Sequence, residues 1–530
     1  MFRKCALLLC LLLCIGLFGT ACAMIPEETV PPTEPPPTET EFVWPANTLR
    51  PDPVTFTHGQ RSKWGEDASM WPVFGSQILR KDITSVTFVD TLSGAPEDAW
   101  DISAGEDGTV LAWTAENGKK HDLFIGAEGS VTVAEDCNTL FAGYVNAKSI
   151  TFGGCLDTKT VTDFSDMFLG CTRLKELDVQ TLDTSEAVDL SGMFYDCEFL
   201  QELDVSAMNT AKAEDMSNMF YGCKGVDVLD VSGFDTDAVQ NMSLMFYNCV
   251  DLEELDLSSF DTSKVTNFSG MFHLCDSLKV LDLSSFNTSS AIDMSNMFYA
   301  CFELTDLNVS SFDTSKVENM YSMFACCYGI QELDVTNFDT SSLTNMTCMF
   351  QECRELRKLD LSSFYTRKVT DMTHLFRECN ELTEVNLSSF DTTWVKSMYG
   401  MFLNCRGLQT LDLSSFDTSR VTNMKGMFNG CTKLTELDLS NFDTGKVTDM
   451  ASMFLNCSSL QKLDLSSFNT ENVTDMSEMF AYCMSLHTLD ISSFVIPHSL
   501  RCPEIFYDCR MLPNDVQQQF YNQLYDLPSA

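Results

Sequence analysis

Hydrophobic and polar positions recur along most of the chain with a period of 26 residues. In one copy, the stretch LTELDLSNF at residues 434–442 alternates apolar and polar side chains, which predicts a short parallel strand. The following FDTGKVTDM, residues 442–450, contains the turn formers Asp, Thr and Gly. Apolar residues then recur at three- and four-residue spacing, the pattern of a short amphipathic helix; they are Val447, Met450, Met453, Phe454 and Cys457. Each coil is therefore predicted to run strand, turn, helix, turn.

One cysteine marks every copy of this unit. The cysteines stand at positions 171, 197, 223, 249, 275, 301, 327, 353, 379, 405, 431, 457, 483 and 509, with no break in the spacing of 26. An ungapped period of this length indicates a solenoid, because no coil can bury its own apolar face and stacking makes one continuous core. The spacing L-x-x-L-x-L within each unit matches leucine-rich repeats. We therefore predict an α/β repeat solenoid, leucine-rich-repeat-like, with a short parallel strand and a short helix in each 26-residue coil.

The solenoid, predicted over residues 139–509, is flanked by two segments of different composition. Residues 42–138 contain short alternating runs typical of strands, and we expect a small mainly-β domain that caps the first coil. Clustered tryptophans can form a sugar-stacking surface, but more often they are the core of a small domain; here they are Trp44, Trp64, Trp71, Trp100 and Trp113. Tyr144 takes the cysteine place in a degenerate first coil, and residues 510–530 predict a helix that caps the other end.

The first residues, 1–23, predict an export signal, since two basic residues precede an apolar run that ends in small residues. Two processing routes fit. The stretch ACA at residues 21–23 suits an ordinary signal peptidase, whereas GTAC at residues 19–22 resembles a bacterial lipobox, which would make Cys22 the lipidated N-terminus. An uncleaved membrane anchor is the third interpretation, disfavoured because the run is short for a span. The protein is therefore expected outside the cell, secreted or lipid-anchored at the cell surface.

A spacer follows the export signal. Residues 24–41 are rich in Pro, Thr and Glu, and such a segment is semi-rigid because proline fixes an extended backbone and the acidic residues repel each other. We expect it to hold the folded part off a surface.

The charge balance restricts the partners. With 76 Asp and Glu against 33 Lys and Arg, the formal net charge is −43, which repels nucleic acid and anionic membranes and favours cations and basic protein surfaces. Catalytic and phosphate-binding motifs such as G-x-S-x-G or H-E-x-x-H are absent, and the carboxylates repeat with the coil where a catalytic pair should be singular. We therefore expect no enzyme and no cofactor; an enzyme within residues 42–138 is a distant alternative.

The cysteine ladder has two interpretations. A zinc site would need clusters such as C-x-x-C, which the sequence lacks, and its six histidines are scattered. Small buried apolar residues are the favoured interpretation, and disulfides between alternate rungs are the other. Two further cysteines, Cys326 and Cys348, lie four residues apart in repeat register and are a separate candidate disulfide.

A second ladder is acidic. The strand triplet carries an outward Asp in eleven coils and Asn308 or Asn386 in two; the aspartates are at 178, 204, 230, 256, 282, 334, 360, 412, 438, 464 and 490. Carboxylates stacked about 5 Å apart repel, and we expect this to raise their affinity for protons and cations. The hypothesis is a concave acidic strip that binds calcium or basic partner residues, with Asp360 and Asp412 as candidates. The alternative is a solubilising face whose carboxylates bond to neighbouring Ser and Thr.

One coil is rich in basic residues, unlike the acidic coils around it. Residues 353–378 are rich in Arg and Lys, and Tyr365 replaces the turn aspartate there, with Trp394 in the next coil. Arginine and aromatic residues are favoured at binding hot spots. The candidate ligand-binding residues are therefore Arg354, Arg357, Lys358, Tyr365 and Trp394, with simple drift of a repeat as the alternative.

The unit LDLSSFDTSKVTNFSGMFHLC, residues 255–275, resembles the BspA-like family of bacterial leucine-rich repeat surface proteins. The upstream stretches VFGSQILRKDITSVTFVDTL and GTVLAWTAENGKKHDLFIGAEGSV are also similar to a leader region common in that family. The resemblance extends from about residue 70 to 510 and implies an adhesin, a protein that binds host extracellular-matrix or cell-surface proteins or other microbes. It implies no catalytic residues, since the family is defined by its repeats.

The expected function is therefore non-catalytic adhesion or protein–protein recognition at a bacterial surface. Affinity would be distributed over variable positions beside the strands, such as Glu253-Glu254, Arg357-Lys358 and Gln409-Thr410. The alternative is a structural or cation-binding surface spacer without a specific macromolecular ligand.

Overall fold

The computed structural model describes residues 45–50, 67–134, 136–496 and 499–525. The chain divides into two units, Met1–Trp44 and Pro45–Ala530. The expected export signal, the lipidation candidate Cys22 and the linker fall in the first unit and lie outside the described residues. The sheet and the coils belong to the second unit.

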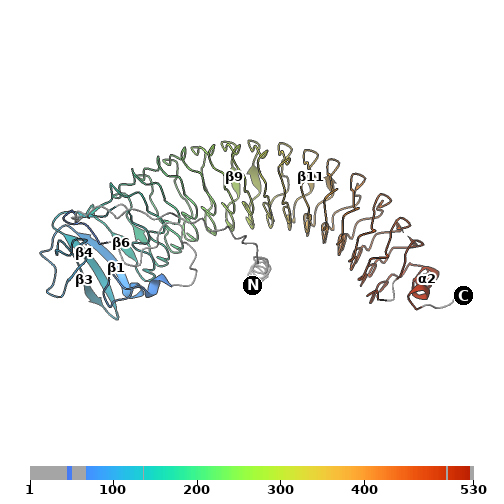
Figure 1. Cartoon of the computed structure of the whole chain (residues 1–530), viewed down its shortest axis with the longest axis horizontal. Coiled ribbons are helices and arrows are strands. Elements are labelled where there is room, and N and C mark those ends of the chain that lie inside the picture. The colour runs from blue at the N-terminus through green and yellow to red at the C-terminus, as the bar shows by residue number, and fades with distance from the viewer. Residues whose placement is uncertain (1–44, 51–66, 135, 497–498, 526–530) are drawn as a thin grey trace, which may run out of the picture. The chain divides into compact units, whose positions relative to one another are not determined.

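The N-terminal part of this unit is built on one six-stranded sheet in the order β2-β3-β4-β1-β6-β8. The two last strands of that order belong to the first coils, so the sheet runs without a break from the N-terminal part into the repeats (Figure 1). The strands β2, β3 and β4 pair antiparallel, and the pairs from β4 through β1 and β6 to β8 are parallel. The bounds are η1 (Ala68–Met70), η2 (Arg80–Asp82), β1 (Ile83–Val89), β2 (Trp100–Asp101), β3 (Val110–Asn117), β4 (Lys120–Ala127), β5 (Val131–Thr132), β6 (Ser149–Thr151), β7 (Leu156–Asp157) and β8 (Glu176–Leu177).

A buried arginine ties the N-terminal part to the first coil. The Arg80 guanidinium, whose residue is 1% exposed, donates to the carbonyl oxygens of Thr139 (2.9 Å) and Ala142 (2.6 Å). It lies over the rings of Trp71 and Tyr144, 5.2 and 5.3 Å from their centroids. Most buried apolar side chains of this part and of the coils form one continuous core, and Trp71 belongs to a small separate cluster with Ala68 and Ala142. Trp71 and Trp113 are each 9% exposed, so these two tryptophans are buried, as the core interpretation predicts.

The coils stack in register, with residue i paired to residue i+26. The first two residues of the Leu-Asp-Leu triplet, with the residue before them, form regular strand in only part of the array, in parallel pairs that join successive coils (Figure 1). The pairs are β9 (Val280–Asp282) with β10 (Asp306–Asn308), β11 (Lys358–Asp360) with β12 (Glu384–Asn386), and β13 (Lys462–Asp464) with β14 (Thr488–Asp490). The side chain in the middle of most of these strands is buried and its two neighbours point outward.

The helix predicted in each coil is wrong. The segment before each cysteine is a run of turns, and two residues per coil take left-handed backbone, such as Ser452 (φ 56°) and Asn456 (φ 59°). The Phe454 N–H donates to the Met479 carbonyl oxygen in the next coil (2.9 Å), and the N–H groups of Ser452 and Asn456 also donate across. A helix would send these N–H groups to carbonyls four residues back along its own turn. Alternate N–H groups of this segment therefore donate between coils, and the ones between them donate three residues back within the coil, as Met453 does to the Met450 carbonyl oxygen (3.2 Å). The apolar side chains predicted to face inward are nevertheless buried.

The other end is closed by α2 (Asn514–Leu524), the one α-helix in the described ranges and within the segment predicted to form a cap. Its Phe520 is 1% exposed and meets the ring of Phe506 edge-on, with centroids 5.5 Å apart. The last coil therefore has its apolar end covered.

Candidate functional site

Three side-chain ladders fill the interior of the stack. In the first, the phenylalanine three positions before each ladder cysteine, or before Tyr144 in the first coil, stacks on its counterpart in the next coil, with ring centroids 5.4–5.9 Å apart from Phe141 to Phe506. These rings are among the largest fully buried side chains of the described residues.

The cysteines form the second interior ladder. Cys431 is fully buried, and its Sγ donates to the Phe402 carbonyl oxygen at 3.2 Å; the other rungs repeat this bond. Burial raises the pKa of the Cys431 thiol to about 12. The ladder cysteines are thiols, which confirms the packing interpretation over inter-rung disulfides. Cys326 and Cys348 are thiols as well, so the candidate bond between them is not formed.

The threonines after the turn aspartates form a third ladder, which the sequence interpretation missed. Thr392 is 1% exposed; its hydroxyl donates to the Asp417 carbonyl oxygen (2.8 Å) and accepts from the Asp417 N–H (2.8 Å). The aspartate of each Asp-Thr pair forms the turn, since the Asp417 carboxylate accepts from the Ser419 N–H (2.9 Å). The threonine has a second role, because it clamps neighbouring coils together.

The strand face is the exposed side of the Leu-Asp-Leu triplets, and it carries the acidic ladder. The Asp412 carboxylate accepts a hydrogen bond from the Ser414 N–H (2.9 Å), and the Asp360 carboxylate from the Ser362 N–H (3.0 Å). These backbone donors lower the pKa of Asp412 and Asp360. The expectation that stacking raises the pKa values is therefore wrong, because local N–H donors outweigh repulsion between solvated charges. Throughout the described ranges, no three His, Cys, Asp or Glu side chains come together as a metal site.

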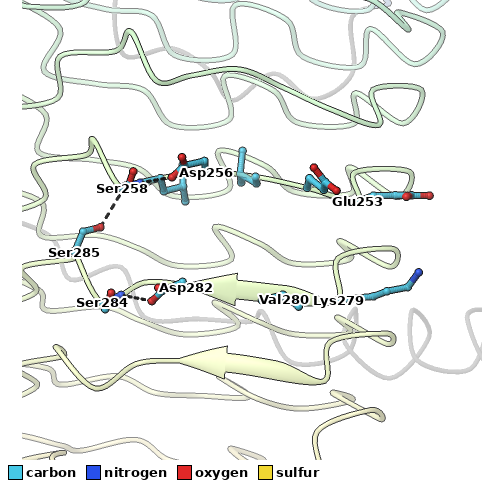
Figure 2. Close-up of a pocket in the computed structure, with 11 residues that line it drawn as sticks. Glu253, Asp256, Ser258, Lys279, Val280, Asp282, Ser284 and Ser285 are labelled. Atoms are coloured by element: carbon cyan, nitrogen blue, oxygen red, sulfur yellow. Dashed lines mark hydrogen bonds between the residues drawn. The ribbon is translucent and has the colours of Figure 1, made fainter.

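A groove crosses the strand face between two neighbouring coils (Figure 2). Glu253 and Lys279 lie at one end of it, and Ser258, Ser284 and Ser285 at the other. The Ser258 and Ser284 N–H groups donate to Asp256 and Asp282, at 2.9 and 3.0 Å. The groove is lined by the variable positions beside the strand, including the Glu253-Glu254 pair expected to contribute to binding.

The basic candidates do not form one site. On the strand face, Arg357 is exposed and Lys358 forms an exposed ion pair with Glu384 (2.7 Å). Arg354 lies before the strand, where it stacks on the Tyr328 ring (4.2 Å) and pairs with Glu352 (2.6 Å). The Arg354 guanidinium is therefore already bound by side chains of this protein.

The aromatic candidates lie beyond the other end of β11. Tyr365 and Trp394 are each 44% exposed, and the Arg420 guanidinium lies 3.9 Å from the Trp394 ring centroid. Sequence reasoning missed Arg420 and Tyr328 as partners. The signal was present, since each stands 26 residues from its partner and in-register residues are neighbours.

A half-buried aromatic column lines another edge of the early coils. Tyr195, Tyr221, Tyr247, His273 and Tyr299 follow one another with centroids 4.1–4.5 Å apart. Desolvation lowers the pKa of His273 to about 3 and raises the pKa of Tyr195 to about 12. The column is therefore neutral at physiological pH and serves packing.

Coils of equal length, paired in register over a leucine-lined core, define the class: a repeat solenoid of leucine-rich-repeat type. The chain belongs to the family described as "Mycoplasma protein of unknown function, DUF285", whose model matches residues 135–249, 222–333, 327–411 and 396–520, together more than half of the sequence.

Two solved structures are similar to this chain. One is a chain of the Toll–Spatzle complex, a hub in Drosophila development and innate immunity, with 14% identity, a TM-score of 0.23, and 70% of this chain and 58% of that chain covered. The other is a chain of the TLR13–ssRNA13 complex, with 15% identity, a TM-score of 0.20, and 72% and 76% covered. The chain thus spans little over half the length of the first. Comparison with curated proteins gave no match. Over the described residues, no helix has the length and apolar character to cross a membrane.

Proposed function

We propose that this protein is a non-catalytic recognition protein of the BspA-like kind, exported and secreted or lipid-anchored at a bacterial surface. Its partners would be host extracellular-matrix or cell-surface proteins, or other microbial surfaces. The supporting observation is the contrast between the two sides of the coil. Repeated residues build the interior ladders, whereas the exposed positions beside the strands, such as Glu253-Glu254 and Arg357-Lys358, differ from coil to coil.

An extended exposed face with changing side chains suits recognition of a large surface, as in other solenoids. The strong acidic excess favours basic protein surfaces over nucleic acid. We infer a partner that contacts several coils at once, with affinity spread over many modest contacts.

The test is binding of the mature full-length chain to an array of matrix proteins, glycans and intact cells. We expect binding to one or a few partners. The double variant Arg357→Glu with Lys358→Glu should weaken binding at least about tenfold if this part of the strand face is a hot spot. Lys462→Glu is the matched control, because Lys462 stands at the register position of Lys358 four coils further on. Equal affinity of the double variant and of Lys462→Glu would show that Arg357 and Lys358 are not a hot spot.

The alternative function is a structural or cation-binding spacer, which the exposed Asp ladder favours. Flat binding across the array would support it over recognition. A calcium titration tests the cation part: an unchanged melting temperature together with no heat of binding would eliminate it.

A further inference from the structure

Two valines stand exposed on the strand face among charged residues. Val228 is 58% exposed and Val280 is 57% exposed. They occupy the same register position two coils apart, with Glu254 between them. In the other coils this position is polar or charged: Glu176, Glu202, Asp306, Glu332, Lys358, Glu384, Thr410, Glu436, Lys462 and Thr488. The sequence Val-Glu-Val across three coils is therefore a local exception, and we call Val228, Glu254 and Val280 the Val-Glu-Val column.

The surroundings of this column are acidic. Over the same three coils, the exposed strand face carries one cation, Lys279. The carboxylates around it are Asp227, Asp230, Glu253, Glu254, Asp256 and Asp282. Several of them accept hydrogen bonds from backbone N–H groups, whereas the Glu253 and Glu254 side chains show no hydrogen bond or ion pair to any residue the structure describes. The groove of Figure 2 runs through this part of the face and includes Glu254 and Val280 in its lining.

The spacing of the column fits a helix better than an extended chain. Paired strands lie about 4.8 Å apart, so the two valines are separated by about 10 Å, with Glu254 midway. In an α-helix, residues i, i+3 or i+4, and i+7 share a face at about 0, 5 and 10.5 Å along the axis. Same-side residues of an extended peptide recur at about 6.6 Å, which does not match the coil spacing.

We propose that the Val-Glu-Val column is the docking site for a basic amphipathic helix of a partner protein, lying across the strands along the stack of coils. Apolar side chains at i and i+7 contact Val228 and Val280, and a Lys or Arg at i+3 or i+4 pairs with Glu254. The surrounding carboxylates attract further cations on the flanks of the helix. This inference rests on the proposed recognition function and specifies one partner chemistry for it.

The test uses a synthetic helical peptide of about 20 residues, long enough to hold helix. It carries Leu at every seventh position and Lys at the intervening i+3 and i+4 positions. Two comparison peptides are a permuted sequence of the same composition, which has no aligned face, and a sequence with Glu in place of Lys. Affinity for the mature full-length chain is measured by calorimetry. We expect the designed peptide to bind at least about tenfold more tightly than either comparison peptide.

Variants of the chain locate the binding. Glu254→Lys should weaken binding of the designed peptide at least about tenfold, and the double variant Val228→Ser with Val280→Ser should also weaken it. Glu436→Lys is the matched control, since Glu436 stands at the register position of Glu254 seven coils further on. All these side chains are exposed, so each variant should keep the melting temperature of the wild type, which checks that it is folded.

Equal affinity for the permuted peptide, or an unchanged affinity in Glu254→Lys, would overturn the inference. A chain that binds host surfaces but not the designed peptide would also overturn it, and would leave the recognition function standing. A chain that binds the peptide through Glu254 but no host surface would support the site and count against the host partner.

Discussion

The interior of the solenoid and its strand face share one 26-residue period but use it in opposite ways. Inside, the same residue returns at every rung, so Phe428 stacks between Phe402 and Phe454 and each ladder thiol bonds to a carbonyl of its neighbour. Outside, the position of Val228 is occupied by glutamate, valine, aspartate, lysine or threonine in other coils. Repetition therefore specifies how coils stack, and the departures from it are where a partner can be recognised.

This difference predicts that equivalent mutations should have very different costs on the two sides. Phe428→Ala removes a fully buried ring from the stack and should lower the free energy of unfolding by about 3–5 kcal/mol. Chemical denaturation measures the change. Tyr365→Ala, which truncates an aromatic ring that is 44% exposed, should cost less than about 1 kcal/mol. Similar losses of unfolding free energy in the two variants would contradict the difference between the interior and the exposed side of the coil.

The buried thiols predict a loss of stability at high pH. Because burial raises the pKa of Cys431 to about 12, the thiol stays protonated when folded, whereas it ionises near pH 9 when unfolded. Its stabilisation is therefore complete below pH 9 and is lost as pH rises toward 12, at about 1.4 kcal/mol per pH unit for each such thiol. Denaturation between pH 8 and 10 measures this slope.

Tyrosine and lysine side chains titrate in the same range, so the thiol contribution needs a variant. Cys431→Ala should give a shallower dependence of the unfolding free energy on pH. A slope identical to that of the wild type would contradict the assignment of the alkaline loss to the ladder cysteines.

Replacing a glycine at one of the two left-handed positions of a coil should change the stability in opposite directions for the observed turns and for the helix first expected. Gly426 has φ 59°, and a Cβ there would meet only ordinary contacts with Leu403 and Asn429. Gly426→Ala should therefore destabilise by about 1 kcal/mol, through the cost of left-handed backbone for alanine. In a helix the same substitution would stabilise by about 1 kcal/mol. A higher melting temperature for Gly426→Ala than for the wild type would contradict the turns and support a helix in this segment.

The smallest effect is expected on the strand face itself. The ion pair between Lys358 and Glu384 joins side chains that are 72% and 68% exposed, so Lys358→Ala should change the free energy of unfolding by less than about 0.5 kcal/mol. Denaturation at low and at physiological salt provides the measurement. A loss above about 1 kcal/mol would show that the strand face also builds the fold.

Most of the architecture could be predicted from the sequence because the period identifies which residues are neighbours. It located the buried cysteine ladder and the segment that contains α2. The path of the backbone was harder, since Met450, Met453 and Phe454 have helical spacing whether the chain coils or turns. The missing signal was Gly, Asn or Asp recurring at two fixed positions in many coils, as at Gly426 and Gly430, which a helix disfavours and left-handed backbone favours.

The candidate site was only partly predictable. The period locates Asp412 on the strand face but does not reveal that a backbone N–H at Ser414 lowers its pKa. Likewise, Trp394 was identified as exceptional, but its contact with Arg420 required placing in-register side chains against each other. The identity of the ligand depends on side chains that differ from the repeat motif, such as Trp394, and the motif itself does not specify them.

The hydrogen bond that the Thr392 hydroxyl donates to the Asp417 carbonyl oxygen is repeated by Thr418 and Asp443, so the same contact joins one pair of coils after another. Removing or duplicating one whole unit of 26 residues would keep the stack of Phe428 and its counterparts, and the thiol–carbonyl bonds, in register. The length of the stack, and the set of exposed side chains that it brings side by side, can therefore change in steps of one coil.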